Sequence, residues 1–463
     1  MTLIKSISGI RGTIGGLSGD GLSPLDVVKF TSSYAQWLKN SIGIQKGKVV
    51  IGRDARISGE MIMCLVQGTL LGLGFDVVNI GLATTPTTEI AVIEEKANGG
   101  IIITASHNPK EWNALKLLNN KGEFLTDIDG KKVLEIAENN QINYSSIDEI
   151  GKVSCSNAYD DIHIKKIITL PLVDLNAIKQ ANFKIAIDCV NSVGGIIIPK
   201  LLDALGVTNI IELYCEPNGI FPHNPEPLPA HLTDISATVK KHQANVGFVV
   251  DPDVDRLAII CEDGSMFGEE YTLVSVADYI LNHTKGNTVS NMSSTRALRD
   301  ITEKHGYSYQ SAAVGEVNVV TAMKETKAVI GGEGNGGIIY PELHYGRDAL
   351  VGIALFLTHL AHTKLTCSAL RKTYPNYFIS KNKIQLTPDI NVDGILLKMA
   401  DKYKNQPVST IDGVKIEFEK EWVHLRKSNT EPIIRIYAES KNEKKADELA
   451  QKTIEEIKQI IIS

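Results

Sequence analysis

The stretch GGIIITASHNP, residues 99–109, changes from an apolar run into a polar loop. Its run Ile101 to Ile103 is β-branched, which predicts a buried strand, so Ser106 lies just beyond the end of that strand. In open α/β sheets, ligands bind at the carboxyl ends of the strands, which is where Ser106 lies. A lone serine before Pro109 would ordinarily bond to nearby backbone in a turn. Three further polar clusters along the chain favour a functional role instead.

The order of elements around this stretch recurs, which indicates an internal repeat. In the first copy, residues 48–51 are a predicted strand, 61–73 a helix, 75–80 a strand, and 101–104 the strand that leads to Ser106. The second copy opens at 183–188 and closes with 246–250, and the third runs from about 287–289 to 328–330. Alternating strands and helices predict mixed or parallel sheets covered by helices, with ligand loops at the carboxyl ends of the strands.

The pattern changes from about Pro375. Residues 414–418, 422–425 and 433–437 are typical of strands, and 443–462 carry the apolar stripe of an amphipathic helix. The predicted fold class is α/β, with three similar mixed-sheet α/β domains and a C-terminal α+β domain. The expected domain limits are residues 1–150, 151–256, 257–373 and 374–463. Linkers are expected near residues 143–155, 256–268 and 374–383.

Length and composition agree with this organisation and exclude several classes of protein. A chain of 463 residues is long enough for three or four domains. Its net charge of −6 argues against a nucleic-acid groove, and no apolar run is as long as a membrane span. The first residues lack an export signal, so we expect a cytoplasmic protein. The six cysteines form no C-x-x-C pair, which indicates neither a disulfide framework nor a zinc site.

The loop Asp251-Pro252-Asp253-Val254-Asp255-Arg256 follows a predicted strand and places three carboxylates at alternate positions. Carboxylate oxygens converging on one hard cation predict a magnesium site. A calcium-binding EF-hand is the competing interpretation, but Arg256 stands where that loop needs glycine, and residues 257–261 are strand-like. Three solvated aspartates without a cation would repel one another.

The loop from Gly331 to Gly337 contains the pattern G-x-G-x-x-G. A dinucleotide site would require a helix to follow, whereas residues 338–340 are apolar and Pro341 would interrupt a helix. The glycines instead allow close backbone approach to a ligand, with Glu333 and Asn335 projecting as acceptor and donor. Hydroxyl-rich ligands suit that pair, although this motif alone is also compatible with a connecting loop.

The fourth cluster, Arg426-Lys427-Ser428-Asn429-Thr430-Glu431-Pro432, lies between two predicted strands. A guanidinium, hydroxyls and a turn rich in N–H groups match a phosphate, although alone this stretch would pass for a hairpin turn. Further candidate cations occur earlier in the chain, and Arg53 beside Asp54 is expected to be structural. These cations are Arg11, Arg53, Lys116 and Arg347.

Together, a nucleophilic hydroxyl, a divalent-cation site, a hydroxyl-reading loop and a phosphate-reading loop predict phosphoryl transfer to and from a sugar. A serine hydrolase that pairs Ser106 with His107 is the rival interpretation. It is weaker because neighbours in sequence seldom align as nucleophile and base, the pattern G-x-S-x-G is absent, and a hydrolase has no use for the three aspartates.

The four motifs, in this order and on this length, resemble the α-D-phosphohexomutase superfamily. The resemblance spans essentially the whole chain and implies four domains in a heart-shaped arrangement around a central cleft. It implies that Ser106 is a phosphoserine, and that Asp251, Asp253 and Asp255 hold one Mg²⁺ together with a phosphoserine oxygen. Residues implied to line the reaction centre are Arg11, His107, Lys116 and Arg256. Residues implied to bind the substrate are Glu333, Asn335, Arg426, Ser428, Asn429 and Thr430.

The implied activity is the interconversion of a hexose 6-phosphate and a hexose 1-phosphate through phospho-Ser106, with a hexose 1,6-bisphosphate as intermediate and activator. Lys116 and His107 both remain candidates for proton transfer. The form Gly334-Asn335-Gly336-Gly337, where common bacterial members have Met-Ser-Gly-His or Gln-Ser-Gly-His, resembles enzymes assigned as phosphoglucosamine mutases. This favours glucosamine 6-phosphate as substrate.

A phosphomannomutase/phosphoglucomutase of broad specificity is the alternative, and a non-catalytic sugar-phosphate binder is a distant third. The only expected partner is a small-molecule sugar phosphate, with neither nucleic acid nor membrane. The protein is expected to be a monomer or a homodimer.

Overall fold

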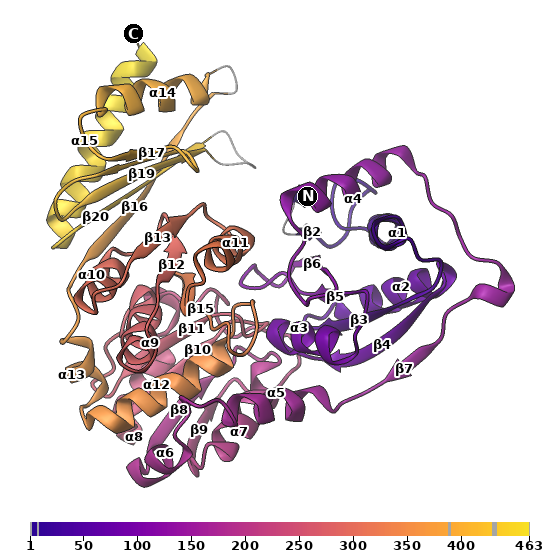
Figure 1. Cartoon of the computed structure of the whole chain (residues 1–463), viewed down its shortest axis with the longest axis horizontal. Coiled ribbons are helices and arrows are strands. Elements are labelled where there is room, and N and C mark those ends of the chain that lie inside the picture. Colours follow the sequence, from indigo (N-terminus) through magenta and orange to yellow (C-terminus); the bar gives the residue numbers. More distant parts are fainter. Residues whose placement is uncertain (1, 7–8, 388–389, 428–432, 463) are drawn as a thin grey trace. The chain divides into compact units, whose positions relative to one another are not determined.

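The computed structural model describes residues 2–6, 9–387, 390–427 and 433–462. The described chain divides into two compact units. The first unit comprises residues 1–272 and 336–370, and the second comprises residues 273–335 and 371–463. The order of the elements along the chain can be followed by colour in Figure 1.

A mixed sheet forms the first part of the first unit. Its strands, in spatial order, are β1 (Leu3–Ser6), β2 (Gly9–Thr13), β6 (Trp112–Leu118), β5 (Gly99–Ile103), β3 (Gly47–Arg53), β4 (Phe75–Leu82) and β7 (Val153–Cys155). Strands β5, β3, β4 and β7 run parallel, whereas β6, β2 and β1 extend the sheet by antiparallel pairs. Residues 143–155, expected to be a linker, contain a short 3₁₀ turn, Ile147–Glu149, and end in β7, so that expectation was wrong for their last three residues.

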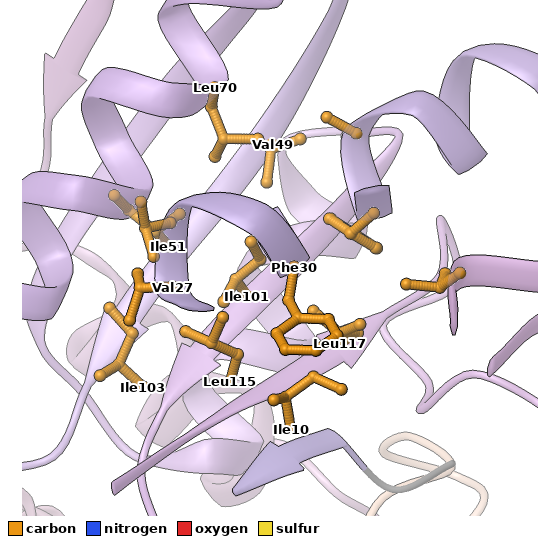
Figure 2. Close-up of a cluster of buried hydrophobic side chains, with 14 of the residues drawn as sticks. Ile10, Val27, Phe30, Val49, Ile51, Leu70, Ile101, Ile103, Leu115 and Leu117 are labelled. Carbon is orange, nitrogen blue, oxygen red and sulfur yellow. The ribbon is translucent and has the colours of Figure 1, made fainter. Parts of the chain in front are cut away.

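Helices cover both faces of this sheet because both sides of its central strands are apolar. Helices α1 (Pro24–Ile42), α2 (Gly59–Gly72) and α4 (Asp127–Asn139) contribute to one core, and Figure 2 shows Val27 and Phe30 of α1 gathered with Ile101 and Leu115 of the sheet. Alternate strand residues such as Val50 and Ile102 point to the other face, where α3 (Thr85–Glu94) and α5 (Tyr159–Ile168) pack. This is a three-layer α/β/α arrangement, as predicted.

A second mixed sheet belongs to the same unit. Its strands, in spatial order, are β11 (Leu257–Cys261), β10 (Val246–Val250), β8 (Lys184–Asp188) and β9 (Asn209–Leu213). Its helices are α6 (Leu175–Ala181), α7 (Gly194–Ala204), α8 (Thr233–His242) and α12 (Ala349–Thr363), with a 3₁₀ turn at Pro229–His231. Residues 256–268, expected to be a linker, contain β11, which pairs antiparallel with β10, so that expectation was wrong.

The second unit opens with three parallel strands in the order β13 (Tyr309–Ala312), β12 (Thr288–Asn291) and β14 (Ile330–Glu333). Helices of this part of the chain are α9 (Glu269–His283), α10 (Ala297–Lys304) and α11 (Glu316–Thr326). The glycine-rich loop after β14 is followed by the strand β15 (Gly337–Ile339) and not by a helix. The dinucleotide interpretation of its G-x-G-x-x-G pattern is therefore excluded.

An antiparallel sheet completes the second unit. Its strands, in spatial order, are β16 (Phe378–Gln385), β20 (Ile433–Ser440), β19 (Trp422–Lys427), β18 (Val414–Glu417) and β17 (Val408–Ser409). Helices α14 (Val392–Lys402) and α15 (Glu443–Ile462) pack on this sheet, and α13 (Cys367–Arg371) precedes it in the chain (Figure 1). The predicted linker 374–383 contains most of β16, which pairs with β20, so this expectation was also wrong.

The described residues contain no helix with the length and apolar character needed to cross a bilayer.

Candidate active site

Ser106 lies beyond the carboxyl end of β5, buried at 3% exposure, and its backbone is left-handed with φ of 50°. Such a conformation costs a residue with a side chain roughly 1–2 kcal/mol, so the surroundings must hold it in place. The N–H of Ser106 donates to Thr104 Oγ1 at 2.9 Å, and its carbonyl accepts from the guanidinium of Arg56.

The side chain of Ser106 meets the loop that follows β10. Its Oγ donates to Asp251 Oδ2 at 2.7 Å and lies 3.3 Å from His107 Nδ1. Asp251 is 145 residues away in sequence, so the fold brings the predicted nucleophile and the predicted metal loop together.

All three aspartates of that loop are fully buried, and the candidate ligand atoms of Asp251, Asp253 and Asp255 lie within 4.8 Å of one another. The backbone N–H groups of Asp255 and Arg256 donate to Asp251 Oδ1 at 3.2 and 3.1 Å, which fixes that carboxylate. Within the described part of the chain, Oδ1 of Asp253 and Oδ1 of Asp255 have no hydrogen-bond partner. A buried carboxylate oxygen without a donor is costly, and a divalent cation would satisfy both, so the residues present fit a metal.

Cations of the chain surround the aspartates. Lys116 Nζ lies 2.7 Å from Asp253 Oδ2 and 3.5 Å from Asp255 Oδ2, and Arg347 Nη2 donates to Asp255 Oδ2 at 2.5 Å. Arg256 Nε is 4.0 Å from Asp251 Oδ2 and 3.8 Å from Asp255 Oδ1. Lys116 and Arg256 were both predicted for this centre; Arg347 was noted only as a cation.

The remaining predicted residues of this centre are His107, which belongs to the Ser106 loop, and Arg11, which contacts that loop. Arg11, on β2, donates through Nη1 to Asn108 Oδ1 at 2.8 Å. The positive charges of Arg11 and Arg256 both disfavour protonation of the His107 imidazole. The fold thus gathers every residue predicted for the reaction centre within the first unit.

Burial and charge set the protonation of these groups. Burial, together with the neighbouring carboxylates of Asp255 and Asp253, raises the pKa of Asp251. Burial also opposes ionisation of Asp253, but the Lys116 ammonium outweighs it and the pKa of Asp253 is lowered. In turn, Asp253 and Asp255 overcome the burial of Lys116 and raise its pKa, so Lys116 is a cation. Burial and the charges of Arg256 and Arg11 lower the pKa of His107 to about 2, so its imidazole is neutral.

The predicted sugar-reading and phosphate-reading residues belong to the second unit. Glu333 is buried, and its Oε1 accepts from Asn291 Nδ2 at 2.8 Å and from the N–H of Gly315 at 3.2 Å. Asn335 follows in the same loop, in which the N–H of Gly334 donates to Ser294 Oγ at 2.9 Å. Arg426 Nε lies 2.8 Å from Asp412 Oδ2. Three predicted phosphate ligands, Ser428, Asn429 and Thr430, lie outside the described residues.

Several residues of the site were missed by the sequence reasoning. Thr85, at the start of α3, donates through Oγ1 to Asp253 Oδ2 at 2.5 Å, and its N–H donates to the Asp253 carbonyl. Asp54 was paired with Arg53, but its carboxylate binds Arg56, while Arg53 donates only to the Asp54 carbonyl among the hydrogen bonds described. The spacing Asp54-Ala55-Arg56 was visible in the sequence, yet nothing local pointed to the Ser106 loop as its partner.

Comparison with protein families matches four successive models to the chain. Three are the α/β/α domains I, II and III of phosphoglucomutase/phosphomannomutase, at residues 3–143, 161–264 and 268–377. The fourth is the C-terminal domain of the same family, at residues 386–456.

Whole-chain relatives have related names. A phosphoglucomutase/phosphomannomutase of Thermococcus kodakarensis is 34% identical over 94% of this chain and 96% of its own length. A phosphoglucosamine/phosphogalactosamine mutase of Sulfurisphaera tokodaii is 32% identical over 98% of both chains. In fold, the chain is similar to a phosphoglucomutase/phosphomannomutase family protein of Burkholderia thailandensis, with a TM-score of 0.82 at 24% identity, over 98% of this chain and 96% of that one.

Proposed function

The chain belongs to the α-D-phosphohexomutase superfamily and is a phosphohexomutase, and on that premise we propose that it converts glucosamine 6-phosphate into glucosamine 1-phosphate. The reaction passes through phospho-Ser106 and a 1,6-bisphosphate that turns end for end. The observation that carries the proposal is the 2.7 Å contact of Ser106 Oγ with Asp251 Oδ2, at the edge of a buried carboxylate triad.

The triad is the proposed Mg²⁺ site, with Asp251, Asp253, Asp255 and an oxygen of phospho-Ser106 as ligands. When bound, a divalent cation supplies positive charge that offsets the negative charge of the transferring phosphoryl group. Oxygen ligands without sulfur or imidazole suit magnesium, calcium or manganese, and the small number of carboxylates beside a phosphate oxygen favours magnesium.

Lys116, Arg11 and Arg256 are proposed to bind and orient the transferring group. Lys116 is held as an ammonium by Asp253 and Asp255, so it supplies charge and cannot accept a proton. His107 Nδ1 lies 3.3 Å from Ser106 Oγ, but the surroundings that keep its imidazole neutral also lower its pKa to about 2, which makes it a weak base. Both residues stay candidates for proton transfer, because the Lys116 ammonium can donate a proton.

Residues of the second unit are proposed to recognise the substrate. Glu333 and Asn335 would read sugar hydroxyls, because Asn291 and the Gly315 N–H hold the Glu333 carboxylate in place. The non-reacting phosphate is proposed to bind Arg426, Ser428, Asn429 and Thr430. A phosphate clamp separate from the reacting serine can hold either end of the bisphosphate.

The choice of glucosamine rests on two observations. The loop contains Gly334-Asn335-Gly336-Gly337, and several relatives carry the name phosphoglucosamine mutase, including one of Methanopyrus kandleri. The Thermococcus relative, named phosphoglucomutase/phosphomannomutase, favours the alternative of a broad enzyme for neutral hexoses.

Phosphorus NMR tests both the reaction and the substrate. The purified protein receives Mg²⁺, a trace of the matching hexose 1,6-bisphosphate, and glucosamine 6-phosphate, mannose 6-phosphate or glucose 6-phosphate in separate tubes. We expect a 1-phosphate signal that grows fastest from glucosamine 6-phosphate. Equal or faster conversion of the neutral sugars would support the broad enzyme.

The Ser106→Ala variant is the control, because it removes the only proposed phosphoryl acceptor and leaves the rest of the site in place. We expect it to fold normally and show no turnover in any tube. Turnover at the wild-type rate in Ser106→Ala would contradict the assignment of the phosphoserine. Silence of the wild-type protein in all tubes, after mass spectrometry has confirmed phospho-Ser106, would favour the sugar-phosphate binder.

A further inference from the structure

Arg56 is a fully buried arginine, 1% exposed, on the turn between β3 and α2. Its five N–H groups have five acceptors: one on Asp54, three on the loop that carries Ser106, and one on the first residue of β6, which follows that loop. The acceptors are Asp54 Oδ2 and the backbone carbonyls of Ser106, Asn108, Pro109 and Trp112. A planar guanidinium can reach four carbonyls in this way, whereas an ammonium offers three donors from one point.

Asp54 anchors a second connection to the same serine. Its Oδ2 accepts from Thr104 Oγ1 at 2.6 Å, and Thr104 Oγ1 in turn accepts the N–H of Ser106 at 2.9 Å. The N–H of Ser106 is therefore tied to Asp54 through Thr104, and the carbonyl of Ser106 is tied to Asp54 through Arg56. Restraint of both backbone groups explains how Ser106 keeps a φ of 50°.

The same turn also reaches the aspartate loop. The N–H of Ala55 donates to Ser192 Oγ at 3.3 Å, and Ser192 Oγ donates to the carbonyl of Pro252 at 2.7 Å. Residues 54–56 are therefore connected to both loops whose side chains meet at Ser106 and Asp251. None of these contacts involves the serine hydroxyl, so the turn can hold the loops without blocking the chemistry.

We propose that Arg56, fixed by Asp54, is a positioning residue for phosphoryl transfer, and that it sets where Ser106 Oγ lies relative to the aspartate triad. This inference rests on the proposed function. If Arg56 had only a structural role, its substitution would lower stability but leave the folded enzyme fully active. If Arg56 positions Ser106, its substitution lowers the rate of phosphoryl transfer even in the folded enzyme, because a small misplacement of a reacting group slows the reaction strongly.

The first test compares Arg56→Lys with Arg53→Lys. Arg53 is the last residue of β3, three positions before Arg56, and its guanidinium donates to the Asp54 carbonyl at 3.1 Å, without a described bond to the Ser106 loop. We expect Arg56→Lys to lower kcat about 100-fold while KM stays within about 3-fold, because the residues proposed to bind the sugar are untouched. Arg53→Lys should retain the kcat and KM of the wild-type enzyme.

The second test uses chemical rescue. Arg56→Ala leaves a hole of guanidinium shape, so guanidinium chloride at tens of millimolar should restore part of kcat, whereas equal sodium chloride should not. Thermal melts show what fraction of each variant is folded, and kcat is expressed per folded molecule. A double-mutant cycle with Thr104→Val should be non-additive, because both side chains restrain the same serine backbone.

A crystal structure of the Arg56→Lys variant tests the inference without any measurement of activity. We expect Ser106 to leave its left-handed conformation, or its Oγ to move away from Asp251. A folded Arg56→Lys enzyme with wild-type kcat, or an unmoved Ser106 in that crystal structure, would overturn the inference. Absence of turnover in the wild-type protein would instead overturn the proposed function, and the position of Ser106 in the variant would still decide the inference.

Discussion

Lys116 shows how a single side chain acts on both charge and stability. It lies between two buried carboxylates, 2.7 Å from Asp253 Oδ2 and 3.5 Å from Asp255 Oδ2, at 5% exposure. Buried carboxylates that lose their counter-charge are strongly unfavourable. The sequence placed Lys116 at this centre through a family resemblance, but its partners became visible only in the structure.

Lys116→Met should therefore lower both stability and activity. Without Mg²⁺ at pH 7, we expect its free energy of unfolding to fall by about 3–5 kcal/mol, because the buried Asp253 carboxylate loses its ion pair with Lys116, while Asp255 still contacts Arg347. Added Mg²⁺ should recover more of that loss in the variant than it adds to the wild-type protein, since the cation replaces the missing charge.

Urea denaturation with and without Mg²⁺ measures this difference, and the NMR assay measures turnover. Lys121→Met is a matched control, because Lys121 is exposed. Equal stability of Lys116→Met and wild type in the absence of Mg²⁺ would contradict the charge argument.

At the scale of elements, the loop between β15 and α12 presents Arg347 to Asp255. His344, in the same loop, is buried between Glu89 of α3 and Asp348 at the start of α12. Its Nδ1 lies 3.2 Å from Glu89 Oε2 and its Nε2 3.2 Å from Asp348 Oδ2. Burial lowers the pKa of His344, but the two carboxylates outweigh burial and raise it to about 10. The imidazolium thus ties the loop to two helices.

This raised pKa predicts a pH dependence of stability. A group whose pKa is higher in the folded state stabilises it fully below the unfolded value of about 6.5, and that contribution is lost as pH rises through about 10. For a shift of this size, the contribution is on the order of 5 kcal/mol. Stability should therefore fall between pH 7 and pH 10.

Urea denaturation of wild type and His344→Gln across that range isolates this histidine from other groups that titrate there. We expect His344→Gln to be less stable at pH 7 and to lose less stability on going to pH 10. His242→Gln is the control, because His242 is exposed at the end of α8. Parallel pH profiles for wild type and His344→Gln would refute the prediction.

At the scale of the whole molecule, the proposed chemistry is divided between the two units. Ser106, the aspartates and Lys116 belong to the first, and Glu333 and Arg426 belong to the second. A substitution in the second unit can therefore weaken binding of the non-reacting phosphate without changing the reacting serine.

Arg426→Gln tests this division. We expect KM for the hexose 6-phosphate to rise at least about 10-fold, because a charge-assisted phosphate contact is lost. The slow hydrolysis of phospho-Ser106 in the absence of sugar should be unchanged. Lys427→Gln is the matched control, because the next residue of β19 points to the other face and is paired with Asp393. A faster or slower loss of phospho-Ser106 in Arg426→Gln would contradict the division of roles.

Much of the fold was predictable because apolar periodicity identifies elements locally. The strands around residues 101–103, 246–250 and 433–437, and the helix 443–462, were predicted close to where they lie. The predictions of three linkers were wrong for one reason. Each segment contains a strand, β7, β11 or β16, that pairs with a sheet built mainly from other parts of the chain. The expected domain limits stay predictions.

The sequence by itself determined which chemistry is available: a serine after an apolar strand, three carboxylates at alternate positions, and glycine-rich and phosphate-type loops. These signals are local, because residue type and spacing suffice to show them. Only the tertiary structure decided which groups meet, such as Ser106 with Asp251 and Asp54 with the serine loop through Arg56 and Thr104. Periodicity reports that a side chain is buried, whereas its partner depends on packing between segments 50 to 145 residues apart.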